Sequence, residues 1–265
     1  MTAGTVLDLK TLDTETRSAL TRHILRLADS KRLLGIRYSD WNLGAPTVET
    51  GIAMSSMTQD EWGHARLLYA MLKELDIDPV EVEHERPAEE YANIGSVDEP
   101  FPDWAATVAG IVVVDGALYT AIAAFARGNL ESARNRCAKM IAEEDFHISL
   151  GAAWYRRLAS SSDEAKKLLR EATDRFLPEA LAWLGTDDGP ARTLVDAGGT
   201  EPGADQVTTF RDYVRDVLAA GGVDVDAVEP ATDEWDAERG RRPGHPDQDT
   251  IERARGDRNR ALFVE

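Results

Sequence analysis

Cysteine, long apolar runs and lysine are all scarce in this sequence. Cys137 is the one cysteine among 265 residues, which excludes an internal disulfide framework. No apolar run is long enough to suggest a membrane span, and the N-terminus lacks the basic-then-apolar order of a secretory signal. We therefore expect a soluble, cytoplasmic protein with no membrane partner.

The scarcity of lysine accompanies a strongly acidic balance. Asp and Glu number 48 against 30 Lys and Arg, which gives a net charge of −18, and only six of the basic residues are Lys. Such a surface repels nucleic acid phosphates and anionic membranes, so no nucleic-acid partner is expected. The same balance is typical of a halophile-like protein in a salt-rich cytoplasm, where screening weakens the self-repulsion.

Helical periodicity dominates the chain, and the alternation typical of strands is scarce. The segment between the second and third predicted helices, residues 77–102, is polar and contains four Pro. Two short links and this long one predict an all-α four-helix bundle with a long crossover between helices 2 and 3. The four predicted helices span about 15–38, 48–75, 104–127 and 130–158.

Further helices are predicted at about 163–184, 208–220 and 249–262. We expect residues 1–190 to form the bundle, with a core at about 14–159. Residues 191–265 are expected to form a C-terminal helical extension with an acidic and Arg-rich tail, packed on the bundle or on a partner. His23 is expected at the surface, on the polar side of the first helix.

The sequence contains Glu-x-x-His twice, at Glu61/His64 and at Glu144/His147. One such pair is usually a solvated helix pair, but here the surrounding apolar positions place both pairs on buried helix faces. Asp115 interrupts the most apolar segment, where an unpaired carboxylate would cost several kcal/mol. Together these residues predict a shared polar site in the core, of the kind found in ferritin-like di-iron bundles.

Four segments carrying these residues are similar to a known family. The chain resembles the ferritin-like subunits of the phenylacetyl-CoA ring epoxidase, the multicomponent oxygenase of aerobic phenylacetate breakdown. The resemblance covers most of residues 20–160 and weakens beyond about residue 190. The segments are "SDWNLGAPTVE" (39–49), "QDEWGHARLLY" (59–69), "VVVDGALY" (112–119) and "EEDFHISLG" (143–151).

The resemblance implies which residues bind iron. Five positions match iron ligands of the family, and the carboxylates among them are the implied catalytic groups. At the sixth position, in the first helix, Lys31 stands where a Glu is expected. A di-iron centre is implied, and a mono-metal or metal-free site stays open because of Lys31. The five matching residues are Glu61, His64, Asp115, Glu144 and His147.

Lys31 also changes the charge balance of the predicted site. Four carboxylates would neutralise two ferrous ions, whereas three carboxylates facing two ions and an ammonium leave about two positive charges in a low-dielectric core. Lys31 could replace an iron by pairing with Glu61 or Glu144. Alternatively, it could be neutral beside the metals, because a buried Lys lowers its pKa readily.

The implied function is oxygen activation, with insertion of one oxygen atom into the aromatic ring of an acyl-CoA. The implied partners are a paralogous ferritin-like subunit, small accessory subunits and a separate flavin/iron–sulfur reductase. One alternative is a non-catalytic structural partner subunit of the same complex, with its site closed by Lys31. Another is a ferritin-like iron oxidase or storage protein.

Overall fold

The computed structural model describes residues 6–260 and residue 262. In this part of the chain every regular element is helical, apart from one isolated β-bridge between Asp236 and Arg241. The predicted fold class, an all-α bundle of ferritin-like type, is confirmed.

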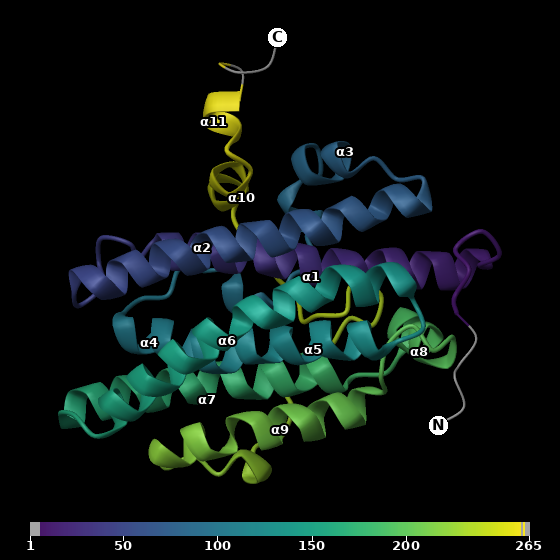
Figure 1. Cartoon of the computed structure of the whole chain (residues 1–265). Coiled ribbons are helices and arrows are strands. Elements are labelled where there is room, and N and C mark those ends of the chain that lie inside the picture. Colours follow the sequence, from purple (N-terminus) through teal and green to yellow (C-terminus); the bar gives the residue numbers. More distant parts are fainter. Residues whose placement is uncertain (1–5, 261, 263–265) are drawn as a thin grey trace.

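The four predicted bundle helices are all present and lie side by side (Figure 1). Three of them begin at a residue whose side-chain oxygen accepts a hydrogen bond from a backbone N–H of the first turn: Asp13, Thr47 and Asp103. Such caps satisfy donors that the helix itself leaves free. The helices are α1 (Thr14–Ser39), α2 (Val48–Tyr69) with its extension η1 (Ala70–Leu75), α4 (Trp104–Ala109) continued by η4 (Gly110–Asp115) and α5 (Gly116–Arg127), and α6 (Glu131–Ala159).

The third bundle helix is not uniform, contrary to the prediction of one regular helix over 104–127. Its middle part, η4, is a π-helix that ends at Asp115. A π-turn widens a helix by one residue and is frequent at functional sites. Because apolar residues occupy nearly every position of this segment, their spacing does not indicate where the turn is widened.

The same helix corrects the expectation that no apolar run reaches the length of a membrane span. Among the described residues, Trp104–Arg127 is long and apolar enough to cross a membrane, but 94% of its apolar window is buried inside the protein. Core helices of soluble proteins meet the same criteria of length and composition. The helix is apolar because it packs against other helices of the bundle.

The crossover contains short helices, namely α3 (Pro79–His84), η2 (Ala88–Glu90) and η3 (Gly95–Val97). Beyond the bundle, Ser162 caps α7, the helix predicted at about 163–184. The predicted helix at 249–262 is interrupted at Gly256, which has a φ of 72°. The later helices are α7 (Asp163–Gly185), α8 (Gly189–Asp196), α9 (Gly203–Ala220), η5 (Val225–Ala227), α10 (Gln248–Arg255) and α11 (Asp257–Arg260).

The helices after residue 190 share the apolar core of the bundle. Leu194, Phe210, Val214 and Ile251 are buried members of the same hydrophobic cluster as the residues of α1 and α5. Packing of the extension on the bundle is therefore observed, while the division into two domains at residue 190 stays a prediction.

His23 is buried, contrary to its expected surface position. Its ring packs edge-on against Phe125, with 4.9 Å between the ring centroids, and only 9% of the residue is exposed. Helix α8, which was not predicted, packs against α1 beside His23. The polar side of α1 therefore faces protein and not solvent.

Candidate metal centre

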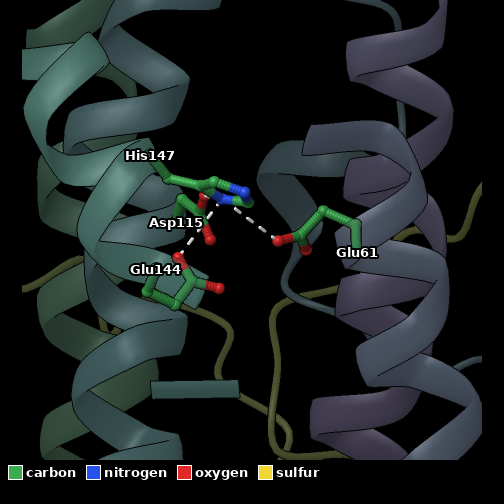
Figure 2. A group of neighbouring side chains, drawn as sticks. All are labelled: Glu61, Asp115, Glu144 and His147. Carbon is green, nitrogen blue, oxygen red and sulfur yellow. Dashed lines mark hydrogen bonds and ion pairs between the residues drawn. The ribbon is translucent and has the colours of Figure 1, made fainter. Parts of the chain in front are cut away.

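Four of the predicted ligands come together in the middle of the bundle. Glu61 projects from α2 towards Asp115, which ends η4, and towards Glu144 and His147 on α6 (Figure 2). One ligand atom from each lies within 4.8 Å of the others, and all four residues are buried. The spacing of three residues brings Glu144 and His147 to the same side of α6.

Close packing of α1 against α2 brings Lys31 near this group. Gly35, one turn after Lys31, faces the second helix, and a Cβ at this position would lie 3.2 Å from the Cβ of Glu61. The same Cβ would lie 2.6 Å from the indole of Trp62. Glycine is therefore needed where α1 crosses the first Glu-x-x-His motif.

The Lys31 ammonium lies among the three carboxylates. Its Nζ donates hydrogen bonds to Glu61 Oε1 at 2.9 Å, to Asp115 Oδ1 at 2.7 Å and to Glu144 Oε1 at 2.5 Å. The Lys31 side chain is fully buried. An ammonium has three donors, and all three are used here. The predicted pairing of Lys31 with Glu61 or Glu144 is thus observed with both, and with Asp115 as well.

Tyr38 is a member of the site that the sequence reasoning missed. Its hydroxyl donates to Asp115 Oδ2 at 2.8 Å, and the same oxygen lies 2.9 Å from Nδ1 of His147. The signal was present, because Tyr38 follows Lys31 by two helical turns on the buried stripe of α1. A stripe alone does not show that a tyrosine uses its hydroxyl.

His64 lies next to the four-residue group without being a member of it. Its Nδ1 is 3.4 Å from Glu144 Oε1 and 3.8 Å from Glu61 Oε1. Its Nε2 lies 3.0 Å from Glu143 Oε2. On the other helix, Nε2 of His147 lies 3.5 Å from Asp60 Oδ2.

The two histidines are thus contacted in a reciprocal way. Each faces the acidic residue that directly precedes the Glu of the other motif, Glu143 for His64 and Asp60 for His147. Carboxylates in this outer position orient imidazoles and fix their tautomer. Asp60 and Glu143 were not predicted. The signal was the acidic residue before each Glu-x-x-His, but the contact itself joins residues far apart in the sequence.

The carboxylates raise the pKa of both basic groups of this cluster, Lys31 and His147. Burial alone would lower the pKa of Lys31, but the charges of Asp115, Glu144 and Glu61 outweigh it and hold that pKa well above its usual range. Burial also opposes protonation of His147, yet hydrogen bonding to carboxylates, first of all to Asp115, raises its pKa to about 12. Two cations therefore face the carboxylates.

The two glutamates of the cluster differ in the direction of their pKa shifts. Burial, reinforced by the charge of Asp115, raises the pKa of Glu61 well above its usual range. For Glu144 burial acts in the same direction but is outweighed, mainly by Lys31, so that its pKa falls well below the usual range. The Lys31 ammonium therefore acts unequally on the two glutamates.

These residues fit one divalent ion better than two. In favour of a metal, Glu61 Oε2 and His64 Nδ1 are buried and lack a hydrogen-bond partner among the described residues. Carboxylate and imidazole are also suitable iron ligands. One divalent ion beside Lys31 would neutralise three ionised carboxylates with both histidines neutral. A pair of ferrous ions does not fit while Lys31 keeps its proton, because about two positive charges would stay uncompensated.

Residues 3–249 match the family described as "Phenylacetic acid catabolic protein". Two components of the 1,2-phenylacetyl-CoA epoxidase of Escherichia coli (strain K12) are similar to the chain. The component designated C is 26% identical over 162 residues, which cover 59% of this chain and 64% of that protein. The component designated A is 27% identical over 175 residues, or 65% of this chain and 56% of that protein. The chain spans less than two thirds of the length of these curated relatives.

The family match extends over nearly the whole chain and includes all six residues around the buried cluster. The helical architecture agrees with it, since the described residues form the expected bundle. The chain therefore belongs to the phenylacetic acid catabolic protein family.

Proposed function

We propose that the chain is a subunit of a multicomponent oxygenase of the phenylacetyl-CoA ring-epoxidase type. It would act in the aerobic catabolism of phenylacetate or of another aromatic acyl-CoA. The observation that carries this proposal is the buried cluster of Glu61, Asp115, Glu144 and His147, with residues from both Glu-x-x-His motifs, in a chain of this family. The similarity to two subunits of one epoxidase supports it further.

The proposed partners follow from the same assignment. They are a paralogous ferritin-like subunit, small accessory subunits, the acyl-CoA substrate and O2. Electrons would come from a separate flavin/iron–sulfur reductase, because one cysteine cannot ligate an iron–sulfur cluster. We propose the cytoplasm as the location. Nucleic acid is not a proposed partner because the net charge of −18 opposes it.

The proposed roles of the site residues follow their positions. Glu61, Asp115, Glu144 and His147 would hold a metal ion, with His64 at its edge. Bound iron would supply the capacity to activate O2. Tyr38 holds Asp115 in place through its hydroxyl. Lys31 holds the three carboxylates together and competes with any second ion for them.

One observation favours a second candidate function, that of a non-catalytic partner subunit. The ammonium of Lys31 donates to one oxygen of each of the three carboxylates, in the place where the resemblance expects a ligand for iron. A site closed in this way would serve the assembly and stability of the complex. The iron-storage alternative is not favoured, because the family and both relatives belong to phenylacetate metabolism.

Iron content per chain after anaerobic reconstitution with ferrous iron tests both candidates. Wild type, Lys31→Glu and the surface control Lys167→Glu would be measured in parallel; the Lys167 side chain is 64% exposed. One or two irons per chain in wild type would support catalysis at this site. Almost none in wild type but about two in Lys31→Glu would support the non-catalytic partner. Iron in neither protein would overturn the metal assignment.

A further inference from the structure

A small apolar cavity lies between α6, α9 and the π-helical segment η4. Its volume is about 40 Å³. Helix α9 packs against α5, α6 and η4, on the side of the bundle opposite α2 (Figure 1). The residues that line this α9 cavity are Ile111, Val112, Ile148, Ala152, Tyr213, Val214 and Val217.

The composition and the size of the cavity restrict what it can hold. Six of the seven lining residues have hydrocarbon side chains, and Tyr213 contributes the one side-chain hydroxyl. An ordered water needs about two to four polar partners, so a cavity of this composition does not favour water. A cavity that binds benzene measures roughly 150 Å³. The α9 cavity therefore fits an apolar molecule of two or three atoms and excludes an aromatic ring.

Two walls of the cavity belong to the elements that carry the buried cluster. Ile148 directly follows His147 on α6. Ile111 lies four residues before Asp115, within the widened turn that ends at this carboxylate. Such π-turns are frequent at functional sites. The cavity is thus next to the site along both α6 and η4.

Two glycines reduce the thickness of the wall between the cavity and the cluster. Gly116 directly follows Asp115, and a Cβ at this position would lie 2.8 Å from the ring of Tyr213. Gly151 lies one turn after His147, and a Cβ there would lie 2.5 Å from Cγ2 of Ile111. Side chains of the cavity therefore occupy the space that larger residues beside the cluster would fill.

The charges of the cluster act on Tyr213 in the cavity wall. Burial raises the pKa of its hydroxyl above the usual range, and the charges of Asp115 and Glu144 act in the same direction. The Tyr213 hydroxyl is therefore protonated and uncharged near neutral pH. Its ring packs against Tyr119, with 5.6 Å between the ring centroids. The cavity thus has uncharged walls although it lies beside a group of carboxylates.

We propose that the α9 cavity holds molecular oxygen and supplies it to the buried cluster. O2 is an apolar molecule of two atoms, so it matches both the size and the composition of the cavity. The lining is buried on the side of η4, at Ile111 and Val112, and half-buried at Ala152 and Val217. Oxygen would therefore enter from solvent between α6 and α9 and pass beside Ile111 towards Asp115.

The supply of oxygen to the cluster rests on the proposed oxygenase function. The affinity of the cavity for O2 does not, because it depends on the walls alone. Helix α9 provides three of the seven lining residues, namely Tyr213, Val214 and Val217. The inference therefore gives the helices beyond the bundle a part in the chemistry of the site.

Methyl NMR of the metal-free full chain under O2 pressure, with N2 as reference, tests the binding. O2 is paramagnetic and accelerates the relaxation of methyl groups that it contacts. The effect on Ile111 should exceed that on Ile24 roughly threefold or more, because apolar surroundings favour O2 over water. Both residues are buried, at 3% and 1% exposure, but Ile24 lies on α1. The effect on Ile111 should also exceed that on Ile52, which is 66% exposed and reports O2 in solvent.

Two variants fill the cavity from opposite walls, Ala152→Leu on α6 and Val217→Phe on α9. Each should reduce the effect on Ile111 to the level of Ile24. The matched control is Ala153→Leu, at the neighbouring exposed position of α6, which should leave the effect unchanged. Thermal unfolding would verify that each variant is folded. An effect on Ile111 no larger than that on Ile24 in wild type would overturn the proposal, as would one that persists in both filled variants.

Stopped-flow oxidation of bound ferrous iron by O2 tests the supply separately. The rate should fall several-fold in Ala152→Leu at unchanged iron content, and it should stay at the wild-type value in Ala153→Leu. Equal rates in wild type and Ala152→Leu would overturn the supply of O2 through the cavity. A wild type that binds no iron would contradict the proposed function and the supply together, whereas the NMR comparison would still decide whether O2 binds.

Discussion

His64 and Glu143 contact each other across the interface of α2 and α6, with 3.0 Å between Nε2 and Oε2. The counterpart contact, from His147 to Asp60, is longer, at 3.5 Å. The two helices that carry the Glu-x-x-His motifs are therefore linked in two ways, through the buried carboxylates and through these outer contacts. The hydrogen bond to Glu143 orients the His64 imidazole whether or not a metal is present.

A double-mutant cycle between His64 and Glu143 should give a coupling energy of about 1 kcal/mol. Either single substitution removes the hydrogen bond between the two residues, so the second substitution cannot remove it again. The measurement is urea unfolding of wild type, His64→Ala, Glu143→Ala and the double variant. Glu143 also pairs with Lys139, at 3.4 Å, but the Lys139 side chain is 68% exposed. A cycle between Lys139 and Glu143 should therefore give less than about 0.5 kcal/mol. Equal coupling in both cycles would contradict a specific role for His64.

Replacing Lys31 by Met should destabilise the protein by about 3–5 kcal/mol, because three buried carboxylates lose their common counter-ion. Urea unfolding in the presence of a chelator measures this. The loss should become smaller at acidic pH, where the carboxylates take up protons instead. Lys167→Met, at an exposed position, should stay within about 0.5 kcal/mol of wild type. A Lys31→Met protein as stable as wild type would show that Lys31 does not neutralise the cluster.

Two glycines in neighbouring helices should respond to alanine in opposite ways. A Cβ at Gly35 would lie 2.6 Å from the Trp62 indole, so Gly35→Ala should cost about 1–3 kcal/mol by forcing α1 and α2 apart. At Gly63 nothing lies within 4 Å of the added Cβ. Gly63→Ala should therefore stabilise α2 by about 0.5–1 kcal/mol through helix propensity. Chemical unfolding of both variants distinguishes close packing from propensity, and a stabilising Gly35→Ala would refute the close approach of the two helices.

His23 should make the stability of the protein fall with acidity. Burial, with a smaller contribution from Arg26, lowers its pKa to about 3, whereas the unfolded chain titrates near 6.5. Between these values the unfolded state binds a proton that the folded state does not. The contribution of neutral His23 is therefore complete above about pH 6.5 and is lost progressively as the pH falls towards 3, by roughly 1 kcal/mol per pH unit.

The variant His23→Gln isolates this effect, because the acidic residues that titrate in the same range are common to both proteins. Urea unfolding at a series of pH values between 7.5 and about 4 should show a steeper loss for wild type than for His23→Gln. Parallel curves would mean that His23 is protonated in the folded protein.

The bundle and most of the cluster could be predicted from the sequence because helix periodicity is local. Glu61 and Glu144 occupy apolar stripes that are visible in single helices, and the resemblance placed Lys31 at the same site. Contacts between distant helices have no such signal. Glu143 reaches His64 from 79 residues away, and His23 is buried by α8, whose short sequence resembles a loop. The predicted start of α9 was five residues late because Gly203 is an atypical first helical residue.

The π-turn at Gly110–Asp115 fixes the number of residues that this segment must contain. The widened turn has the effect of one inserted residue, which rotates α5 relative to α4 by about 100°. The π-turn therefore allows α4 to pack against α7 while Asp115 still points towards Lys31. A deletion of Val113 would leave an apolar helix of good propensity, yet it would turn either Asp115 away from Lys31 or α4 away from α7. The number of residues in this apolar stretch is thus as restrictive as their chemical type.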